Sequence, residues 1–581
     1  MYSLVALILA IVWIILVYRF YGRYLDRKIV QADPKKTTPA VMYMDGVDFM
    51  PANRYVLFGF QFKSICGLGP IVGAILAVNW GWVPAMLYLF FGAAFLGLIH
   101  DYTSTMVGIR REGMSLGGMS YSLISPRARS IVSISIFFGM MLGLGAFALL
   151  ISGNLMRPHA PLGIIIWILM GLLAGQMIYK WKQGIITTTV VTVVITFLGI
   201  FFITSLGPVQ ASCKWVSGGD KPPIIFGTVN QAKFIWVIAI LVFCYFGATL
   251  PIWRWAQPIN YLRFWVVFIG MIGIGLRILL RNPSFGNFPA FRGWWWGENP
   301  LWPMLFVTIM CGAVSGWHCL VGSSGTARMI ENETDTLPVA GGAMLLEMII
   351  GVLALIVAVS AFGSFEGYTL VLNKGGGVVF AMGAGKFLSA IGMPAESAAI
   401  YANILFAVIG LTVIHLGVRF MRLYGSEVFG ERWPIFKNVY FCAFFSVALF
   451  AVFCFTGVLE TVWFLGGAFN QMMAGMALLI ASCWLAYERK NYRLTLYPSI
   501  FLLITTISAA IWISVGTLKH FFTTPQIAVD RAIGDWMTFF ISLLGLSCNA
   551  VLIKDAFAAI SKFTQKKEEA IPAATPTGGS Q

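Results

Sequence analysis

The sequence predicts an all-α polytopic membrane protein with about fifteen transmembrane helices. Of its 581 residues, 59% are hydrophobic and only 11% are charged, a composition that excludes an ordinary soluble domain. Apolar stretches of roughly 20 residues recur from Tyr2 to the region of Ile560, and this is the length that an α-helix needs to cross a bilayer. The loops between these stretches are mostly short, so we expect the lipid bilayer to surround most of the chain.

The formal net charge of +16 does not indicate a nucleic-acid partner, because the basic residues collect in loops on one side of the predicted spans. If the N-terminus lies outside, the cytoplasmic loops hold most Lys and Arg residues, including Arg110, Arg111, Lys566 and Lys567. This is the positive-inside pattern. It predicts an external N-terminus and a cytoplasmic C-terminus.

The chain divides into four predicted regions. The first span ends in Arg19 and Arg23 without a small-residue cleavage site, so it is typical of a retained helix and not of a cleaved signal peptide. The regions are an N-terminal helix with a cytoplasmic connection (1–54), a first membrane-embedded region (55–363), a C-terminal helical region (364–560) and a disordered cytoplasmic tail (561–581).

Two spans contain residues that interrupt a helix. In 301–327, Gly312, Ser315, Gly316 and the run 322–325 crowd a segment at membrane depth. Such a segment is typical either of a helix unwound around a small polar solute or of close helix packing through small residues. In 55–79, Gly67 and Gly69 precede Pro70, which lacks a backbone donor.

The two interrupted spans indicate an inverted repeat. Five spans can be counted from each of them, over 55–206 and 301–486, and the two sets run in opposite orientations. This arrangement favours five-helix inverted repeats with a site at the midplane. A further candidate break at 247–251 leaves another register of the repeats open.

Ionisable groups at membrane depth are the candidate functional residues, because lipid makes them costly. Lys63 is expected either to bind a substrate carboxylate or to pair with Glu347. Glu347 is expected either to carry a coupled proton or to accept hydrogen bonds from buried hydroxyls. His100 and Asp101 are adjacent, so we expect them to point to different sides and not to pair; an inner-gate cluster is the alternative to an ion site at Asp101.

His415 is a candidate pH-sensitive gate or a histidine packed under a basic rim. The predicted substrate-binding residues are Lys63, Gly67, Gly69, Ser315, His318, Ser323, Ser324, Asn470 and Gln471. The predicted ion-coupling residues are Asp101, His318, Glu347 and His415.

No metalloprotease or nucleotide-binding motif is present. The chain has no HExxH or GxxxxGK[ST] pattern and no CxxC pair, and we expect no enzyme activity, no cofactor and no metal. Without an ATP site, active transport would have to use an ion gradient. A secondary transporter is therefore predicted, with a channel or a membrane-embedded metabolite sensor as the alternatives.

Several motifs also resemble the carbon starvation protein A family: TPAVMYMDGVDFMPANRYVLFG, GLGPIVGAILA, RREGMSLG, CGAVSGWHCLVGSSGTARMIENETD, GAMLLEM and GAFNQMMA. The resemblance implies a LeuT/APC-like fold in the bacterial plasma membrane and uptake of pyruvate or short peptides during carbon starvation. It implies proton symport, with sodium as the alternative ion. The chain departs from the family pattern at Lys63, His100 and His415. The resemblance therefore supports the fold more strongly than the substrate.

Overall fold

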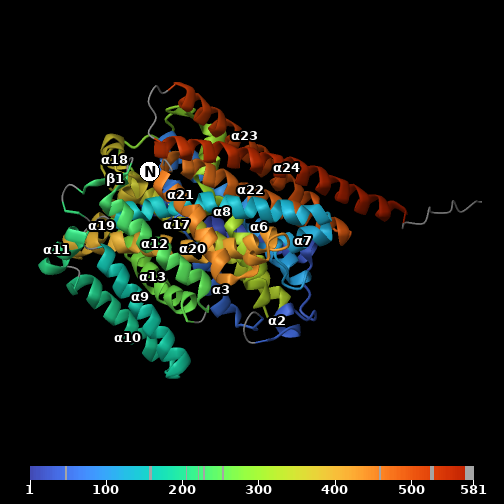
Figure 1. Ribbon diagram of the computed structural model, residues 1–581, viewed down its shortest axis with the longest axis horizontal. Coiled ribbons are helices and arrows are strands. Elements are labelled where there is room, and N and C mark those ends of the chain that lie inside the picture. Colours follow the sequence, from blue (N-terminus) through green and yellow to red (C-terminus); the bar gives the residue numbers. More distant parts are fainter. Residues whose placement is uncertain are drawn as a thin grey trace, which may run out of the picture.

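The computed structural model describes the whole chain except residues 46–48, 156–159, 204–205, 217, 220–221, 227–228, 252–253, 457–458, 524–528 and 570–581. Almost all of the described chain is helical, and α8, α17, α20 and α22 occupy the centre of the bundle whereas α9 and α10 project from one side (Figure 1).

The α-helices are α1 Ser3–Leu16, α2 Pro39–Met42, α3 Arg54–Ile65, α4 Gly69–Ala77, α5 Trp82–Gly92, α6 Leu98–Arg110, α7 Leu116–Leu123, α8 Pro126–Leu155, α9 Ala160–Gly175, α10 Ile185–Leu198, α11 Gly207–Val216, α12 Gln231–Thr249, α13 Ala256–Arg281, α14 Phe306–Thr308, α15 Met310–Ala313, α16 Gly316–Ser324, α17 Gly342–Ser360, α18 Phe365–Leu372, α19 Gly376–Ser389, α20 Ala395–Phe429, α21 Val439–Thr456, α22 Leu459–Tyr487, α23 Arg493–Thr523 and α24 Val529–Glu569. Short antiparallel pairs join β1 Ile224–Phe226 to β2 Val229–Asn230 and β3 Trp295–Trp296 to β4 Asn299–Pro300.

The described residues contain 13 helices long and apolar enough to cross a membrane, or up to 14 if the bent pair α3–α4 counts as one span. The segment from α14 to α16 is too fragmented to count as one continuous helix. The all-α polytopic fold with two interrupted helices is therefore confirmed. The number fifteen and the register of the repeats stay predictions.

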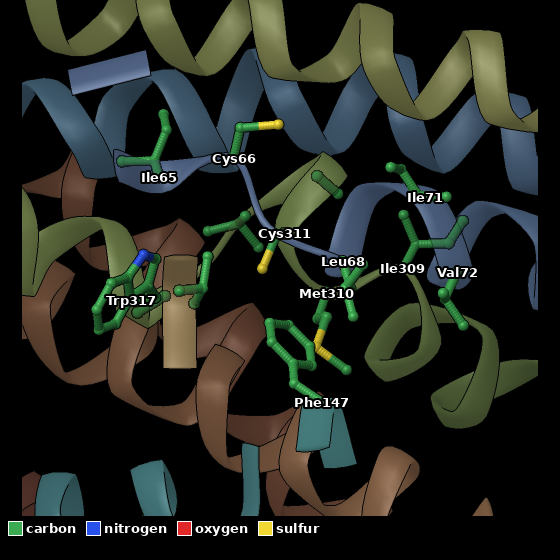
Figure 2. Close-up of a cluster of buried hydrophobic side chains, with 14 of the residues drawn as sticks. Ile65, Cys66, Leu68, Ile71, Val72, Phe147, Ile309, Met310, Cys311 and Trp317 are labelled. Carbon is green, nitrogen blue, oxygen red and sulfur yellow. The ribbon is translucent and has the colours of Figure 1, made fainter. Parts of the chain in front are cut away.

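The first interruption separates α3 from α4, which are bent by 50°. Cys66 leaves the helical conformation with ψ 106°, and the next helix begins at Gly69 with Pro70 in its first turn. A proline is tolerated in a first turn because its missing donor would have no helical partner there. Figure 2 shows the non-helical link from Cys66 to Leu68 passing beside Cys311.

The second interruption separates α15 from α16. Val314 and Ser315 are extended, with φ of −165° and −146°, and both are buried. An extended buried backbone needs hydrogen-bond partners from neighbouring elements. The helix break that the Gly and Ser residues predict is thus confirmed.

Glycines bring the two interrupted segments into close contact. A Cβ added at Gly73 of α4 would lie 2.4 Å from the Thr308 carbonyl oxygen of α14, and one at Gly69 would lie 2.5 Å from Cys311 Sγ. Small residues permit such backbone approach in membranes. Gly316 in the second interrupted span is packed as closely, since an added Cβ would meet the Asn470 carbonyl oxygen, so the close-packing alternative for the small residues of that span also holds there.

Helices α8 and α20 are the third spans of the two predicted units, and they pack together through a regular glycine row. Cβ atoms added at Gly410, Gly417 and Gly425 of α20 would meet Ile151, Leu144 and Phe137 of α8, respectively. The α20 numbers rise as the α8 numbers fall, so the two helices run antiparallel, as third spans of oppositely oriented units should.

Isolated β-bridges connect the segments at the ends of the spans in two separate places. Tyr2 bridges to Ser284, whereas Thr37 bridges to Asn332 and Ala52 to Ile330. The N-terminus thus lies beside the 282–300 loop, and the connection after the first span lies against the segment that follows α16.

One predicted boundary needs correction. The chain from 561 was expected to be disordered, but α24 continues to Glu569. The strong helix formers Lys566, Lys567 and Glu568 favour this extension. Residues 570–581 lie outside the described residues.

We predict that Gly73→Ala destabilises the protein by about 1–3 kcal/mol, because its Cβ would overlap a backbone carbonyl that cannot rotate away. Unfolding of the purified protein in detergent micelles measures the change. The matched control is Gly59→Ala, since a Cβ at Gly59 meets nothing within 4 Å. Equal stability of the two variants would contradict the close approach.

Candidate functional site

A small central cavity of about 50 Å³ lies between the two interrupted helices. Gly67 borders it from the first break, and Cys311 and Trp317 border it from the second. Phe147 of α8 and Asn470 of α22 also line it; Figure 2 shows Phe147, Met310, Cys311 and Trp317 gathered here. The cavity has room for a few water molecules, so a larger solute requires the surrounding helices to move apart.

Asn470 supplies the hydrogen bonds that the second break lacks. Its Oδ1 accepts from the Trp317 backbone N–H at 3.0 Å and from Ser315 Oγ at 3.2 Å, and its Nδ2 donates to Ser315 Oγ at 3.0 Å. The neighbouring Gln471 donates to the Phe306 carbonyl oxygen at 2.8 Å. The predicted residues Ser315 and Asn470 therefore meet at the cavity, whereas Gln471 supports α14.

Four buried ionisable side chains form a continuous chain beside the cavity. His100 Nδ1 lies 2.7 Å from Asp101 Oδ1, and Asp101 Oδ2 lies 2.8 Å from His318 Nδ1. His318 Nε2 lies 3.0 Å from Glu347 Oε2. The predicted ion-coupling residues Asp101, His318 and Glu347 are thus brought together from α6, α16 and α17.

The expectation that His100 and Asp101 do not pair is wrong. Helical spacing separates their Cβ directions, but the Asp101 carboxylate has two oxygens, and one faces each histidine. Sequence spacing alone does not capture this arrangement, because it ignores the freedom of the side-chain torsions.

The chain of four groups can hold and move a proton. A neutral imidazole has one N–H, yet both nitrogens of His318 face carboxylate oxygens. His318 Nε2 lies close to Glu347, but the geometry of this contact is not that of a hydrogen bond. Both carboxylate oxygens of Glu347 are buried, and neither has a hydrogen-bond partner among the described residues. A proton added to His318 or to the Glu347 carboxylate would supply the donor for a hydrogen bond between these two side chains.

Cys311, His318 and Glu347 also bring their ligand atoms within 4.8 Å of one another, so this trio could hold a metal ion. Thiolate, imidazole and carboxylate are all transition-metal ligands, and Asp101 would orient the imidazole from behind. The absence of a metal stays a prediction.

Lys63 lies in a neighbouring cavity and does not line the central one. Beside it is Arg263 of α13, a buried residue that the sequence analysis missed although it stands inside a predicted apolar span. Its Nη1 donates to the Lys63 carbonyl oxygen at 2.6 Å, and its Nη2 donates to that of Cys66. Arg263 thereby satisfies carbonyl groups at the C-terminal end of α3, where a cation also complements the helix dipole.

The pairing of Lys63 with Glu347 is absent among the described residues, since the ion pairs of Glu347 involve His318 alone. The Ser323 hydroxyl donates to the Cys319 carbonyl oxygen at 2.6 Å, and neither Ser323 nor Ser324 lines the central cavity. His415 donates to the Leu411 carbonyl oxygen and packs against Phe243, apart from the four-group chain. The functional roles of these residues stay predictions.

The sequence matches the family described as "Carbon starvation protein CstA" over residues 2–367 and 361–509. The chain belongs to this family. It is 28% identical to "Peptide transporter CstA" of Bacillus subtilis (strain 168), with 92% of this chain and 94% of that protein covered. It is also 28% identical to "Pyruvate/proton symporter BtsT" of Escherichia coli (strain K12), with 88% and 80% covered.

Among solved structures, MhsT in complex with L-phenylalanine is 13% identical, with a TM-score of 0.47 over 85% of this chain and 99% of that chain. The Eremococcus coleocola manganese transporter, in complex with an aromatic bis-isothiourea substituted compound, is 15% identical, with a TM-score of 0.36 over 86% and 95%.

We predict that Asn470→Ala destabilises the protein by about 1–3 kcal/mol, because it removes the partner of the buried Trp317 N–H and of the Ser315 hydroxyl. Unfolding in detergent micelles measures the loss. Asn373→Ala is the control, since Asn373 is exposed. A stability of Asn470→Ala equal to that of the control would show that α22 does not support the break.

Proposed function

We propose that this protein is a secondary active transporter that imports a small, pyruvate-like carboxylate or short peptides together with protons. The observation that carries the proposal is the buried His100–Asp101–His318–Glu347 chain, which lies beside a small cavity between two interrupted helices. Relatives named as a peptide transporter and a pyruvate/proton symporter support both the solute class and the ion.

The solute would bind between the breaks. The half-helices α4 and α16 begin at Gly69 and Gly316, close to cavity residues Gly67 and Trp317. The N-terminus of a helix carries a partial positive charge and attracts a carboxylate. Ser315 and Asn470 would add hydrogen bonds from the second break once the cavity widens.

The proton would bind at Glu347 and His318, with Asp101 holding the imidazole in place. His415, on α20, stays a second candidate for the protonation element. A group that changes charge on protonation inside lipid-surrounded protein alters the stability of its surroundings. Protonation is therefore able to favour one arrangement of the interrupted helices over another.

Two contacts, one toward each end of the bundle, would have to open for alternating access to the central cavity. On one side, the rings of Phe147 and Trp463 stack with centroids 6.1 Å apart, and Trp463 borders a separate cavity of about 340 Å³. On the other side, the Arg110 guanidinium and the Glu333 carboxylate form a bidentate ion pair with N–O distances of 2.6 and 2.7 Å. Alternating access would open these contacts in turn.

The positive-inside pattern supports the orientation in which the N-terminus and the Trp463 side are external and the Arg110 side is cytoplasmic. We propose that the protein is a multi-pass carrier of a bacterial plasma membrane. A sensor would bind its metabolite without moving it, and a channel would need an open path; the relatives' names favour neither.

Uptake of labelled pyruvate into proteoliposomes under an inward proton gradient, with short peptides as competitors, tests the proposal. We expect accumulation above equilibrium that disappears when a protonophore collapses the gradient. Glu347→Gln should abolish gradient-driven accumulation but retain substrate exchange, because it removes the protonation step and leaves the central cavity intact. The exposed Glu366→Gln is the control and should behave as wild type.

Gradient-driven accumulation by Glu347→Gln at the wild-type level would contradict the role of this residue. Binding without accumulation by the wild type would identify a sensor, and dissipation without accumulation would identify a channel. Either result would overturn the transporter proposal.

A further inference from the structure

We propose that Lys63 and Arg263 form a second anion site, separate from the central cavity, which binds a monocarboxylate with an apolar tail. This site does not rest on the proposed transport function, because it concerns a different cavity and is tested by binding alone.

The site is a cavity of about 220 Å³ between α3, α13 and α17. Its charged lining residues are Lys63 and Arg263, and Cys66 lies beside them. The remaining lining is aromatic or aliphatic, and it includes Phe62, Phe264, Phe268, Met271, Ile350 and Leu353. One end of the cavity thus carries positive charge while the walls are apolar.

The two cations of this site interact with acids only at longer range than an ion pair among the described residues, with Glu347 in electrostatic range of Arg263. Arg263 is 2% exposed, and its two terminal nitrogens donate to the Lys63 and Cys66 carbonyl oxygens. The Lys63 ammonium lies 5.3 Å from the centre of the Phe60 ring. Among the described residues, neither cation takes part in an ion pair with a carboxylate.

An unpaired cation at this depth is unfavourable, and its usual partner is an anion or a polar group within the protein. Arg263 already has neutral acceptors for two donors, so Lys63 is the cation with unused hydrogen-bonding capacity. A carboxylate at Lys63 would form a charge-assisted hydrogen bond and would lie in the field of Arg263.

The walls select the rest of the ligand. A bare anion such as acetate would leave the apolar surface in contact with water, whereas an alkyl chain would cover it. Each methylene buried there should tighten binding about fourfold. Phe268 and Ile272 line the cavity and are each 45% exposed on the outer surface of α13, so the site lies next to the lipid-facing surface.

A carboxylate with an apolar tail could reach this site from water or from the membrane. Fatty acids would come from the bilayer, and branched or aromatic 2-oxo acids would come from solution. The chemistry at Lys63 is the same for both sources.

Binding of radiolabelled octanoate to the protein in nanodiscs, with empty nanodiscs as background, tests the site. We expect saturable binding that is at least tenfold weaker in Lys63→Gln, since a hydrogen bond to a charged group is lost. Lys63→Arg keeps the charge and should bind. Lys386→Gln is the matched control, because Lys386 also lies over a phenylalanine ring, 4.8 Å from Phe362, but outside this cavity.

Competition on the wild-type protein checks the charge without any substitution. Octanoate and decanoate should displace the label, whereas octan-1-ol and octylammonium should not. Displacement by water-soluble 4-methyl-2-oxopentanoate would assign the natural ligand to solution, and displacement by long-chain fatty acids alone would assign it to the bilayer.

Three results would overturn the proposal: no saturable octanoate binding by the wild type, unchanged binding by folded Lys63→Gln, or equal displacement by octan-1-ol. These results leave gradient-driven pyruvate uptake untouched, so a failure of this site and a failure of the transport proposal are separable.

Discussion

The interior of this bundle is organised by the need to satisfy polar groups where lipid supplies no hydrogen bonds. Two helices are interrupted at depth, and each free backbone group there needs a partner from the protein. Asn470 serves the second break, and Arg263 serves the first. Both partners come from helices outside the interrupted segments. Their loss would change the shape of the central cavity as well as the stability of the fold.

The same constraint links the cavity to the buried ionisable chain through α16. Trp317 lines the cavity, and its indole donates to the Ser64 carbonyl oxygen at 2.8 Å, next to the first break. The adjacent His318 lies between Asp101 and Glu347. A displacement of α16 that makes room for a solute would therefore change the contacts of His318. This is a physical route by which solute binding and protonation could depend on each other.

The sequence predicts the interruptions well because Gly and Pro act locally on the backbone. It also identifies Asp101, His318 and Glu347 as functional candidates, because any charge in an apolar span is conspicuous. The sequence cannot show that Asp101, His318 and Glu347 are in contact, since they come from helices far apart in the chain. Nor can it show that the His100 side chain turns toward Asp101. Arg263 was missed although its charge inside an apolar run could have identified it. The sequence also does not show that Lys63 lines the neighbouring cavity and not the central one, because the side from which a side chain leaves a broken helix depends on packing.

We infer that a proton binds within the His318–Glu347 contact when the solute binds. An infrared difference spectrum of the membrane-embedded protein, recorded on addition of pyruvate, tests it directly. We expect a carboxylic acid C=O band to change on pyruvate addition, and we expect Glu347→Gln to remove this change while Glu366→Gln retains it. A pyruvate-induced spectrum without any carboxyl band, or with the same band in Glu347→Gln, would contradict the claim.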